Sequence, residues 1–496
     1  MSTEKRHYEM IRLGLSTGCF FDTDISIFFT FISLDRSFCS DEKYFSIPIR
    51  FWRYGNEHDG QHNEVFEIPA QLVGCFVVEN EGMYQIWRFY SGRFPSLLYD
   101  NFYEYVIKYE SDIHKFKTIP RKGQQTELII FGDTGTEFPK VLHSISEKFE
   151  NILILHAGDG TYGTNTGECY LEKQSRELDS KCSWACSGVR CLASSRLTFN
   201  VLQKIKSDWI KEFDKFIEGG KFYWMTTMGN HDNDLQYFFS QRPTFSSAQP
   251  GVGNKSFDSE LATSLVFSDA SLIEKQSLSL ELLKKPFYYS FEYGLAHIIE
   301  ISNEDNPMNA YESYNGLPLT KELNDRFENH FGEFSEQYIW LEADLLKASL
   351  NRELRPWIIV MTHRPLYHTS SHHPACGIDG DWYGCKFRDL YEPLLKKYGV
   401  NIVFTGHSHH YSRSKPMYKG EVDEVNGIVH LVVGTGGFDI TGDSWSETPL
   451  WLARRQGTQY GHVHLQILNY SHVHGTHYSS KNNQVLDSFW IKNDKN

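Results

Sequence analysis

The sequence predicts an α+β protein with two domains, an N-terminal β-sandwich over residues 1–120 and a larger unit of strands and helices over residues 121–496. The chain has 496 residues, which is more than one hydrophobic core usually supports. Aromatic residues make up 15% of the chain, and aromatic side chains favour strands. The spacing of apolar residues changes near residue 120, which places the domain boundary there.

The N-terminal part contains short strand-like runs and no strong helical pattern. Residues 66–92 and 101–120 alternate apolar with polar side chains, and Gly, Asn, Asp and Pro separate the runs. Several such runs within about a hundred residues are typical of a β-sandwich. The polar segment TIPRKGQQ (118–125) then fits a linker.

The pattern after the linker is that of a β-α-β unit. The apolar segment 127–131 runs into the turn GDTG, residues 139–151 have helical spacing, and residues 152–156 form a second apolar run that ends in AGDGTY. Such a unit gives two parallel strands with a right-handed crossover. Both acidic turns therefore fall at the carboxyl ends of strands, where open α/β sheets place their ligands.

Three later segments repeat this strand-to-turn design: FYWMTTMGNHD (222–232), PWIIVMTHRPLY (356–367) and VNIVFTGHSHHY (400–411). Residues 204–217 and 335–349 have helical spacing between them. The second domain is therefore expected to continue the alternation of strands and helices.

Charge and hydropathy exclude two classes of partner. The formal charge is −14, whereas a nucleic-acid binder needs a basic face that displaces counterions. The apolar run Ile25 to Leu34 is too short to span a membrane. The overall charge also does not steer an anionic substrate toward the protein, so its attraction must be local.

The sequence gives conflicting signs about the compartment. The N-terminus lacks a continuous apolar segment, so no signal peptide is visible. Asn254 and Asn469 nevertheless stand in glycosylation acceptor sequences, as expected of a glycoprotein if the chain is secreted. The compartment stays open.

The nine cysteines leave two alternatives, disulfides in an oxidising compartment or free thiols in a reducing one. Cys376 and Cys385 could close a loop. A cysteine-rich stretch could form a small zinc site, but it lacks paired C-x-x-C spacing, so two disulfides fit it better if the chain is secreted. That stretch holds Cys169, Cys182, Cys186 and Cys191.

Five successive strand ends carry side chains that bind metals. Each alone is a weak signal, because a Gly-Asp after a strand is usually a turn or a cap. Together they bring hard oxygen donors and imidazoles to one sheet edge, as a site for two transition metals requires. Asp159 is the preferred bridging carboxylate. In chain order the strand ends carry Asp133, then Asp159 with Tyr162, then Asn230 and His231, then His363, then His407 and His409.

The sequence GHSHHY raises the question of which histidines are ligands. If these residues leave the strand in an extended conformation, His407 and His409 point to the same side. They could then reach two ions. His410 would point away, toward packing or solvent.

These blocks carry a resemblance to a known family. GD-x-G (132–135), GD-x-x-Y (158–162), GNH-[D/E] (229–232), H-x-P-x-Y (363–367) and GH-x-H (406–409) resemble, in this order, the five blocks of the calcineurin-like metallophosphoesterases. The tyrosine of the second block narrows the resemblance to the purple acid phosphatases. Residues 288–302, 336–345 and 457–491 also look like strands and a helix of that family. The resemblance implies a fibronectin-III-like domain in front of a two-sheet α/β/β/α metallophosphoesterase sandwich.

The resemblance also implies a role for each position. Asp159 would bridge the two ions, and His231 would lie behind the ligands. His372 and His373 stand at the spacing of a His-His pair that contacts substrate in the family; a solvated loop is the alternative. The first ion, Fe(3+), would be held by Asp133, Tyr162 and His409, and the second, divalent iron, zinc or manganese, by Asn230, His363 and His407.

The function implied is that of an acid phosphatase that hydrolyses phosphate monoesters with a metal-bound hydroxide. His231, His372 or His373, when protonated, would stabilise the phosphate and protonate the leaving group. A related phosphodiesterase, nucleotide or phytate hydrolase is one alternative, and an inactive scaffold on the same fold is another. The expected partner is a phosphate ester, with no nucleic acid and no membrane span. A homodimer stays open. Family resemblance favours a secreted, endomembrane or vacuolar location, although no signal peptide is visible.

Overall fold

The computed structural model describes residues 8–17, 25–33, 46–54, 64–80, 83–95, 97–109, 112–135, 137–160, 222–229, 288–304, 328–367, 369, 382–440 and 448–493. The described helices with assigned bounds are α1 (Phe138–Ser146), α7 (Glu336–Leu350) and α8 (Trp382–Lys397). Seven strands precede the predicted linker: β1 (Tyr8–Thr17), β2 (Ile25–Ser33), β3 (Ser46–Arg53), β4 (Phe66–Asn80), β5 (Met83–Phe94), β6 (Phe102–Ile107) and β7 (His114–Lys117). No described helix is both long and apolar enough to cross a bilayer.

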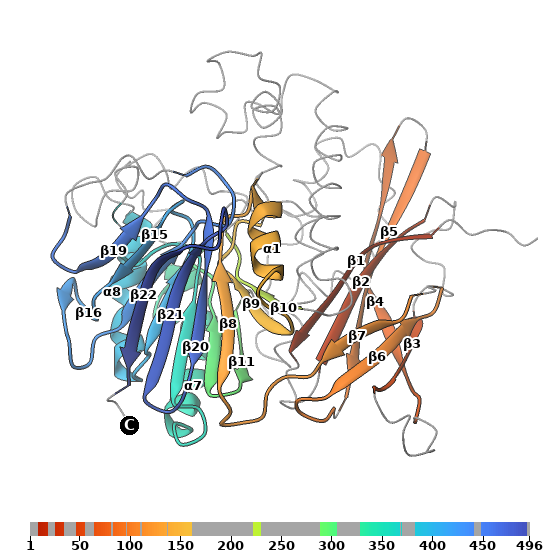
Figure 1. Ribbon diagram of the computed structural model, residues 1–496, viewed down its shortest axis with the longest axis horizontal. Coiled ribbons are helices and arrows are strands. Elements are labelled where there is room, and N and C mark those ends of the chain that lie inside the picture. Colours follow the sequence, from red (N-terminus) through yellow and green to blue (C-terminus); the bar gives the residue numbers. More distant parts are fainter. Residues whose placement is uncertain are drawn as a thin grey trace, which may run out of the picture.

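The strands β1 to β7 pair antiparallel in the order β1-β2-β5-β4-β3-β6-β7. Figure 1 shows them as a block of strands beside the rest of the protein. Aromatic rings fill the inside of this block, with Phe51 and Phe116 both packed on Phe94 at centroid distances of 4.9 and 5.3 Å. The β-rich character predicted for residues 1–120 is confirmed over the described residues, and the fibronectin-III-like assignment stays a prediction.

Most of the remaining described strands belong to two sheets. The first has the order β22-β21-β20-β8-β9-β10 and continues through one pairing, Leu15 with Tyr223, into β1. Its strands are β8 (Thr126–Phe131), β9 (Ile152–His156), β10 (Phe222–Thr226), β20 (Gly461–Ile467), β21 (His472–Ser479) and β22 (Val485–Lys492).

The second sheet has the order β11-β12-β13-β14-β18-β15-β19. Its strands are β11 (Tyr289–Tyr293), β12 (Ala296–Glu300), β13 (Trp357–Met361), β14 (Ile402–Thr405), β15 (Tyr411–Ser414), β18 (Val429–Val433) and β19 (Leu452–Gln456). A separate hairpin pairs β16 (Met417–Tyr418) with β17 (Glu421–Val422).

The two sheets pack face to face with helices on their outer faces, which agrees with the predicted α/β/β/α order. Alternate residues of β8 face opposite ways: Ile130 lies in the core between the sheets, and Ile129 packs with α1. In the second sheet Ile359 faces the inner core, and Ile358 packs with α7 and α8. All five residues of β9 and of β13 are buried, as expected for strands covered on both faces.

The predicted β-α-β unit is present. β8 and β9 are parallel, with Leu128 opposite Leu153, and α1 connects them (Figure 1). Helix α1 begins with a proline in its first turn, where a missing N–H costs little. The unit therefore sends both acidic turns to the same end of the sheet.

Helix α7 is fixed by its cap and by a buried ionic network. The Ser335 side chain accepts a hydrogen bond from the Tyr338 backbone N–H, which satisfies one orphan donor at the helix start. His297 on β12 contacts Asp344 of α7 through Nε2 at 2.8 Å and Glu292 through Nδ1 at 3.0 Å. Burial by itself lowers the pKa of His297, but the two carboxylates outweigh it and raise that pKa to about 9.

Replacing His297 with Gln is expected to lower the free energy of unfolding by about 2–3 kcal/mol below pH 6.5. The raised pKa of the folded state makes this contribution complete below the ordinary value of 6.5, and it is lost as the pH rises through about 9. Chemical denaturation of both proteins across this pH range measures it.

His143→Gln is the control, because the His143 side chain is 73% exposed and forms an ion pair with Glu147, the C-cap of the same helix. A loss for His297→Gln that is equal at both ends of the pH range would show that the imidazole acts by packing and not by charge.

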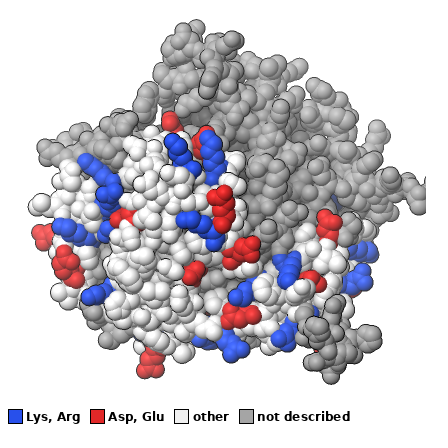
Figure 2. Space-filling view, viewed as in Figure 1, with Lys and Arg blue, Asp and Glu red and all other residues white. Residues whose placement is uncertain are grey.

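Figure 2 shows how charged side chains are distributed on one face of the described residues. Lysine and arginine are interspersed there with aspartate and glutamate over the described residues.

Candidate metal centre

The candidate centre lies where strand ends from both sheets meet. Asp133 and Asp159 follow β8 and β9 of the first sheet, and His363 follows β13 of the second. His407 and His409 follow β14. The prediction of a single sheet edge was wrong in this respect: parallel strands of two facing sheets end at the same rim, and each sheet supplies part of the site.

The backbone takes a left-handed conformation at three of these positions. The φ angles are 63° at Asp133, 53° at Asp159 and 65° at His407. Non-glycine residues rarely adopt this region, and such strain gathers at functional sites. The expectation that the chain leaves β14 extended was therefore wrong at His407.

The Asp133 carboxylate connects the two sheets. Its Oδ2 accepts a hydrogen bond of 2.9 Å from the backbone N–H of His407. Its Oδ1 lies 3.6 Å from Nε2 of His409. His407 and His409 therefore both lie beside Asp133, although a left-handed residue and not an extended strand brings them there.

His363 is held with one ring nitrogen directed at Asp159. Its Nδ1 lies 2.8 Å from the carbonyl oxygen of Ala157, an acceptor that requires an N–H on Nδ1. Its Nε2 lies 3.3 Å from Oδ2 of Asp159. Burial opposes a charge on this ring, but the neighbouring carboxylates, Asp159 foremost, raise the pKa of His363 to about 10. The surroundings of this ring thus favour a positive charge at Nε2.

These groups fit a transition-metal site. Donor atoms of Asp159, His363 and His407 lie within 4.8 Å of one another, and all three residues are buried. Carboxylate and imidazole are the ligands that suit iron, zinc and manganese. The hydrogen bond from His363 to Ala157 also supplies the outer contact that orients most metal-binding histidines.

Glycines allow this close approach. A Cβ at Gly406 would lie 2.6 Å from Oδ2 of Asp133 and 2.6 Å from the carbonyl oxygen of Ala157. A Cβ at Gly158 would lie 2.6 Å from Nδ1 of His363. Gly158 and Gly406 are therefore required because any side chain at these positions would collide with a candidate ligand.

Sequence reasoning did not identify the ion pair beside the histidines. Arg364, directly after His363, lies with Nε 2.7 Å from Oε1 of Glu304, and both side chains are almost fully buried. Its Nη1 lies 3.4 Å from Nε2 of His407. Arg364 stands inside the fourth block, but nothing in the sequence indicates that residue 304 would be its partner.

The remaining predicted site residues have separate outcomes. His410 is fully buried, which agrees with the packing alternative and not with solvent contact. Cys385 is in a disulfide, which agrees with the disulfide alternative and not with the free-thiol alternative for this cysteine. The predicted roles that lie outside the described residues are those of Tyr162, Asn230, His231, His372 and His373.

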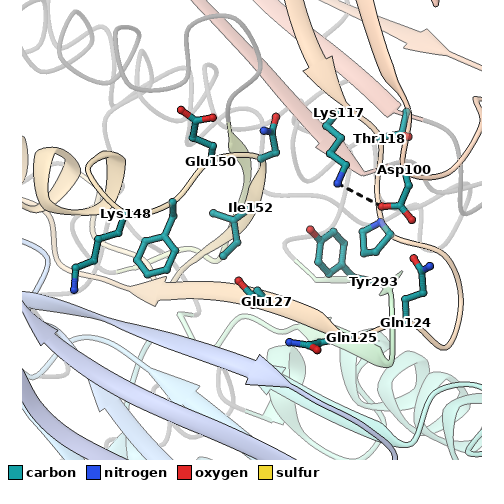
Figure 3. Close-up of a pocket in the computed structure, with 13 residues that line it drawn as sticks. Asp100, Lys117, Thr118, Gln124, Gln125, Glu127, Lys148, Glu150, Ile152 and Tyr293 are labelled. Carbon is teal, nitrogen blue, oxygen red and sulfur yellow. Dashed lines mark ion pairs between the residues drawn. The ribbon is translucent and has the colours of Figure 1, made fainter. Parts of the chain in front are cut away.

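A cavity of about 560 Å³ lies at the other end of the strands. It is lined by residues at the start of β8 and β9, such as Glu127 and Ile152, and by Asp100 and Lys117 from the N-terminal part (Figure 3). The candidate ligands follow the carboxyl ends of the same two strands. This cavity is therefore separate from the metal centre.

Gly406→Ala is expected to lower the metal affinity about 10- to 100-fold, the range seen when ligand orientation is disturbed. The reason is the collision of the new Cβ with Asp133. Metal analysis after dialysis against a chelator, with near-ultraviolet circular dichroism to verify folding, measures this.

Gly420→Ala is the matched control. Gly420 has φ 81°, so the change strains the backbone, but a Cβ added there would meet no atom within 4 Å. Equal metal retention by Gly406→Ala and the wild type would refute the spatial argument.

The chain is similar to several proteins that are named as phosphatases. A family model described as Calcineurin-like phosphoesterase matches residues 109–411, and one described as Iron/zinc purple acid phosphatase-like protein C matches residues 427–488. Acid phosphatase type 7 of Homo sapiens is 31% identical over 226 residues, which cover 41% of this chain and 45% of that protein. Purple acid phosphatase 18 of Arabidopsis thaliana is 33% identical over 208 residues, covering 41% and 40%.

Two further matches bear on the metals and the fold. The Fe(3+)-Zn(2+) purple acid phosphatase 12 of Arabidopsis thaliana is 28% identical over 298 residues, covering 56% of this chain and 51% of that protein. A purple acid phosphatase from yellow lupin seeds has a similar fold, with a TM-score of 0.59 at 18% identity, covering 98% of this chain and 75% of that one. The chain spans about half the length of the curated relatives it matches.

Proposed function

Because the chain belongs to the calcineurin-like phosphoesterase family, we propose that it hydrolyses phosphate monoesters at a binuclear metal centre, as an acid phosphatase of the purple acid phosphatase type. The observation that carries the proposal is the convergence of buried donors from two sheets, with Asp159, His363 and His407 within 4.8 Å of one another. The names of the similar proteins point to the same activity.

The proposed ligands follow from the strand ends. Asp133, Tyr162 and His409 hold the ferric ion, and the contact between Asp133 and His409 at 3.6 Å supports their pairing. Asn230, His363 and His407 hold the divalent iron, zinc or manganese. Asp159 bridges, and its contact with His363 at 3.3 Å supports this position. The naming of a relative as an Fe(3+)-Zn(2+) enzyme supports iron with a divalent partner.

Each protein group has a part in the reaction. Two cations supply Lewis acidity, which makes water nucleophilic and neutralises charge on the phosphoryl group. Asp159 would hold both ions through its carboxylate, and Ala157 fixes the tautomer of His363 through its carbonyl oxygen. His231, His372 and His373 are proposed to stabilise the phosphate oxygens and to donate a proton to the leaving alkoxide when they are charged.

The domain boundaries and the assembly belong to the proposal as well. Residues 1–120 form a fibronectin-III-like domain, and residues 121–496 form the catalytic domain. The position of the described segment 118–125, which connects β7 with β8, supports this boundary. The substrate is a phosphate ester. A homodimer stays open as the assembly.

Asp159→Ala is expected to remove both metals and to abolish turnover of a phosphate monoester, because the proposed bridge is lost. Metal analysis and hydrolysis of a chromogenic monoester measure the two effects. Asp487→Ala is the control, since Asp487 is a carboxylate that pairs with Arg413 at 2.9 Å and belongs to no strand end of the centre.

Turnover retained in Asp159→Ala would refute the bridging role. A wild-type protein that binds no metal and cannot be reconstituted would refute the phosphatase and leave the scaffold alternative.

Replacing the neighbouring histidines is expected to separate the two metals. His407→Ala loses the divalent ion and keeps iron, whereas His409→Ala loses iron and with it the visible band expected from a tyrosinate on ferric iron. His410→Ala keeps both metals but unfolds at a lower temperature, since His410 is fully buried. Elemental analysis and absorption spectra measure the pattern; iron lost from His410→Ala but not from His409→Ala would reverse the assignment.

A further inference from the structure

The ion pair of Arg364 and Glu304 lies against a proposed ligand and has no part in the function described so far. We propose that Arg364 is a positioning residue of the divalent-metal site: its guanidinium occupies the lone pair of His407 while no metal is bound, and thereby weakens the affinity of that site for its metal. The inference rests on the proposed function, because it takes His407 as a ligand of the divalent ion.

The guanidinium is held firmly in place. Arg364 Nε lies 2.7 Å from Oε1 of Glu304, and Nη2 donates to Oε2 at 3.1 Å. The backbone of Arg364 is fixed as well, because its N–H donates to Oδ1 of Asn303 and its carbonyl accepts from Nδ2, each at 2.9 Å. Two side chains from the end of β12 therefore determine where this cation lies.

The contact with His407 fixes the chemistry of the ring. Arg364 Nη1 lies 3.4 Å from Nε2 of His407, and a guanidinium can only donate. When Nε2 accepts this hydrogen bond, it is the nitrogen that carries the lone pair. A neutral imidazole has one such nitrogen, so the other carries a proton.

The single lone pair makes Arg364 and a metal competitors. A metal at Nε2 displaces the guanidinium directly. A metal at Nδ1 moves the ring proton to Nε2, which can then no longer accept from Arg364. In either case the metal gains a bond only after the hydrogen bond is lost, and a cation remains close to the site.

The alternative is that the pair only stabilises the fold. A matched pair exists for this comparison at the opposite end of the same strand, β13. There Arg355 Nε lies 2.6 Å from Oε2 of Glu292, and the Arg355 side chain is as buried as that of Arg364. Arg355 precedes the strand by two residues and lies at the end remote from the strand-end ligands.

The test compares zinc affinities of metal-free proteins, measured by competition with a chelator at mildly alkaline pH. The main variant combines Arg364→Met with Glu304→Gln, so that both charges disappear together. The two single changes show the effect of charge alone, and Arg355→Met with Glu292→Gln is the matched control. His407→Ala identifies which of the zinc affinities belongs to the site that includes His407.

The main variant is expected to bind zinc at the His407 site about fivefold or more tightly than the wild type, with unchanged stoichiometry, because a charge-assisted hydrogen bond no longer competes. The matched control is expected to leave this affinity unchanged. Arg364→Lys, which keeps the charge and is expected to stay with Glu304, also binds zinc more tightly, and it serves if the main variant does not fold.

Two results would overturn the inference while leaving the proposed function intact. Equal zinc affinity of the main variant and the wild type would show that the contact between Arg364 and His407 does not affect metal binding. Any effects of Arg364→Met or Glu304→Gln alone would then come from the change in charge. Weaker binding would show that Arg364 supports the metal. If His407→Ala changes no zinc affinity, the ligand assignment fails, and the inference fails with it.

Discussion

The hydrogen bond from the backbone N–H of His407 to the Asp133 carboxylate, at 2.9 Å, joins the two sheets at the rim where the candidate ligands lie. Backbone hydrogen bonds continue the connection, since Gly132 donates to the carbonyl of Val433 and Gly436 donates to that of Gly132. A metal centre built from two sheets needs this link, because the described carboxylates Asp133 and Asp159 follow strands of one sheet and the described candidate histidines follow strands of the other. The rest of the candidate site depends on how closely the sheets approach here.

The close approach explains the unusual backbone of the site. Asp133, Asp159 and His407 have positive φ angles, which cost L-residues of order 1 kcal/mol each. Such turns reverse the chain directly after a strand and direct the polar side chains into the gap between the sheets. The neighbouring glycines then leave no Cβ where Asp133 and His363 must lie. The metals, by satisfying charges that are otherwise brought together in a buried place, are expected to offset part of this strain.

The sequence predicted those parts of the fold that local pattern determines. β8, α1 and β9 have a clear change from strand to helical spacing, and the structure agrees. Helix α8 was not singled out, because Pro393 interrupts its pattern and tertiary packing outweighs the local signal. The division of the strand ends between two sheets depends on pairing partners far apart in the chain, such as β14 with β18, which periodicity does not encode.

The candidate ligands could be predicted because local sequence pattern marks them, whereas the ion pair of Glu304 and Arg364 beside them could not. Asp133, Asp159 and the histidines stand directly after apolar strands, so their type and place both carry a signal. Glu304 follows a strand too, but a lone acidic residue there usually indicates a turn. Its pairing with Arg364 across 60 residues is a fact of the fold. From the sequence, His410 was distinguished from His407 and His409 only because alternate residues of an extended segment point to opposite sides. Its complete burial supplies the physical reason for a packing role.

At acidic pH, the conditions that favour the proposed catalysis also lower the stability of the fold. His430 and His477 are buried, and burial lowers the pKa of each to about 3, while His297 is held charged by carboxylates. A histidine kept neutral in the fold stabilises it fully above 6.5, and the stabilisation is lost as the pH falls from there toward 3, because the unfolded chain takes up the proton first. His297 gives no compensation in that range, since its contribution is already complete below 6.5. The histidines proposed for catalysis become protonated as the pH falls. Over the same pH range the buried neutral histidines cease to stabilise the fold. The acid limit of activity should therefore be set by unfolding of the β14–β18 and β20–β21 region, not by the chemistry of the centre.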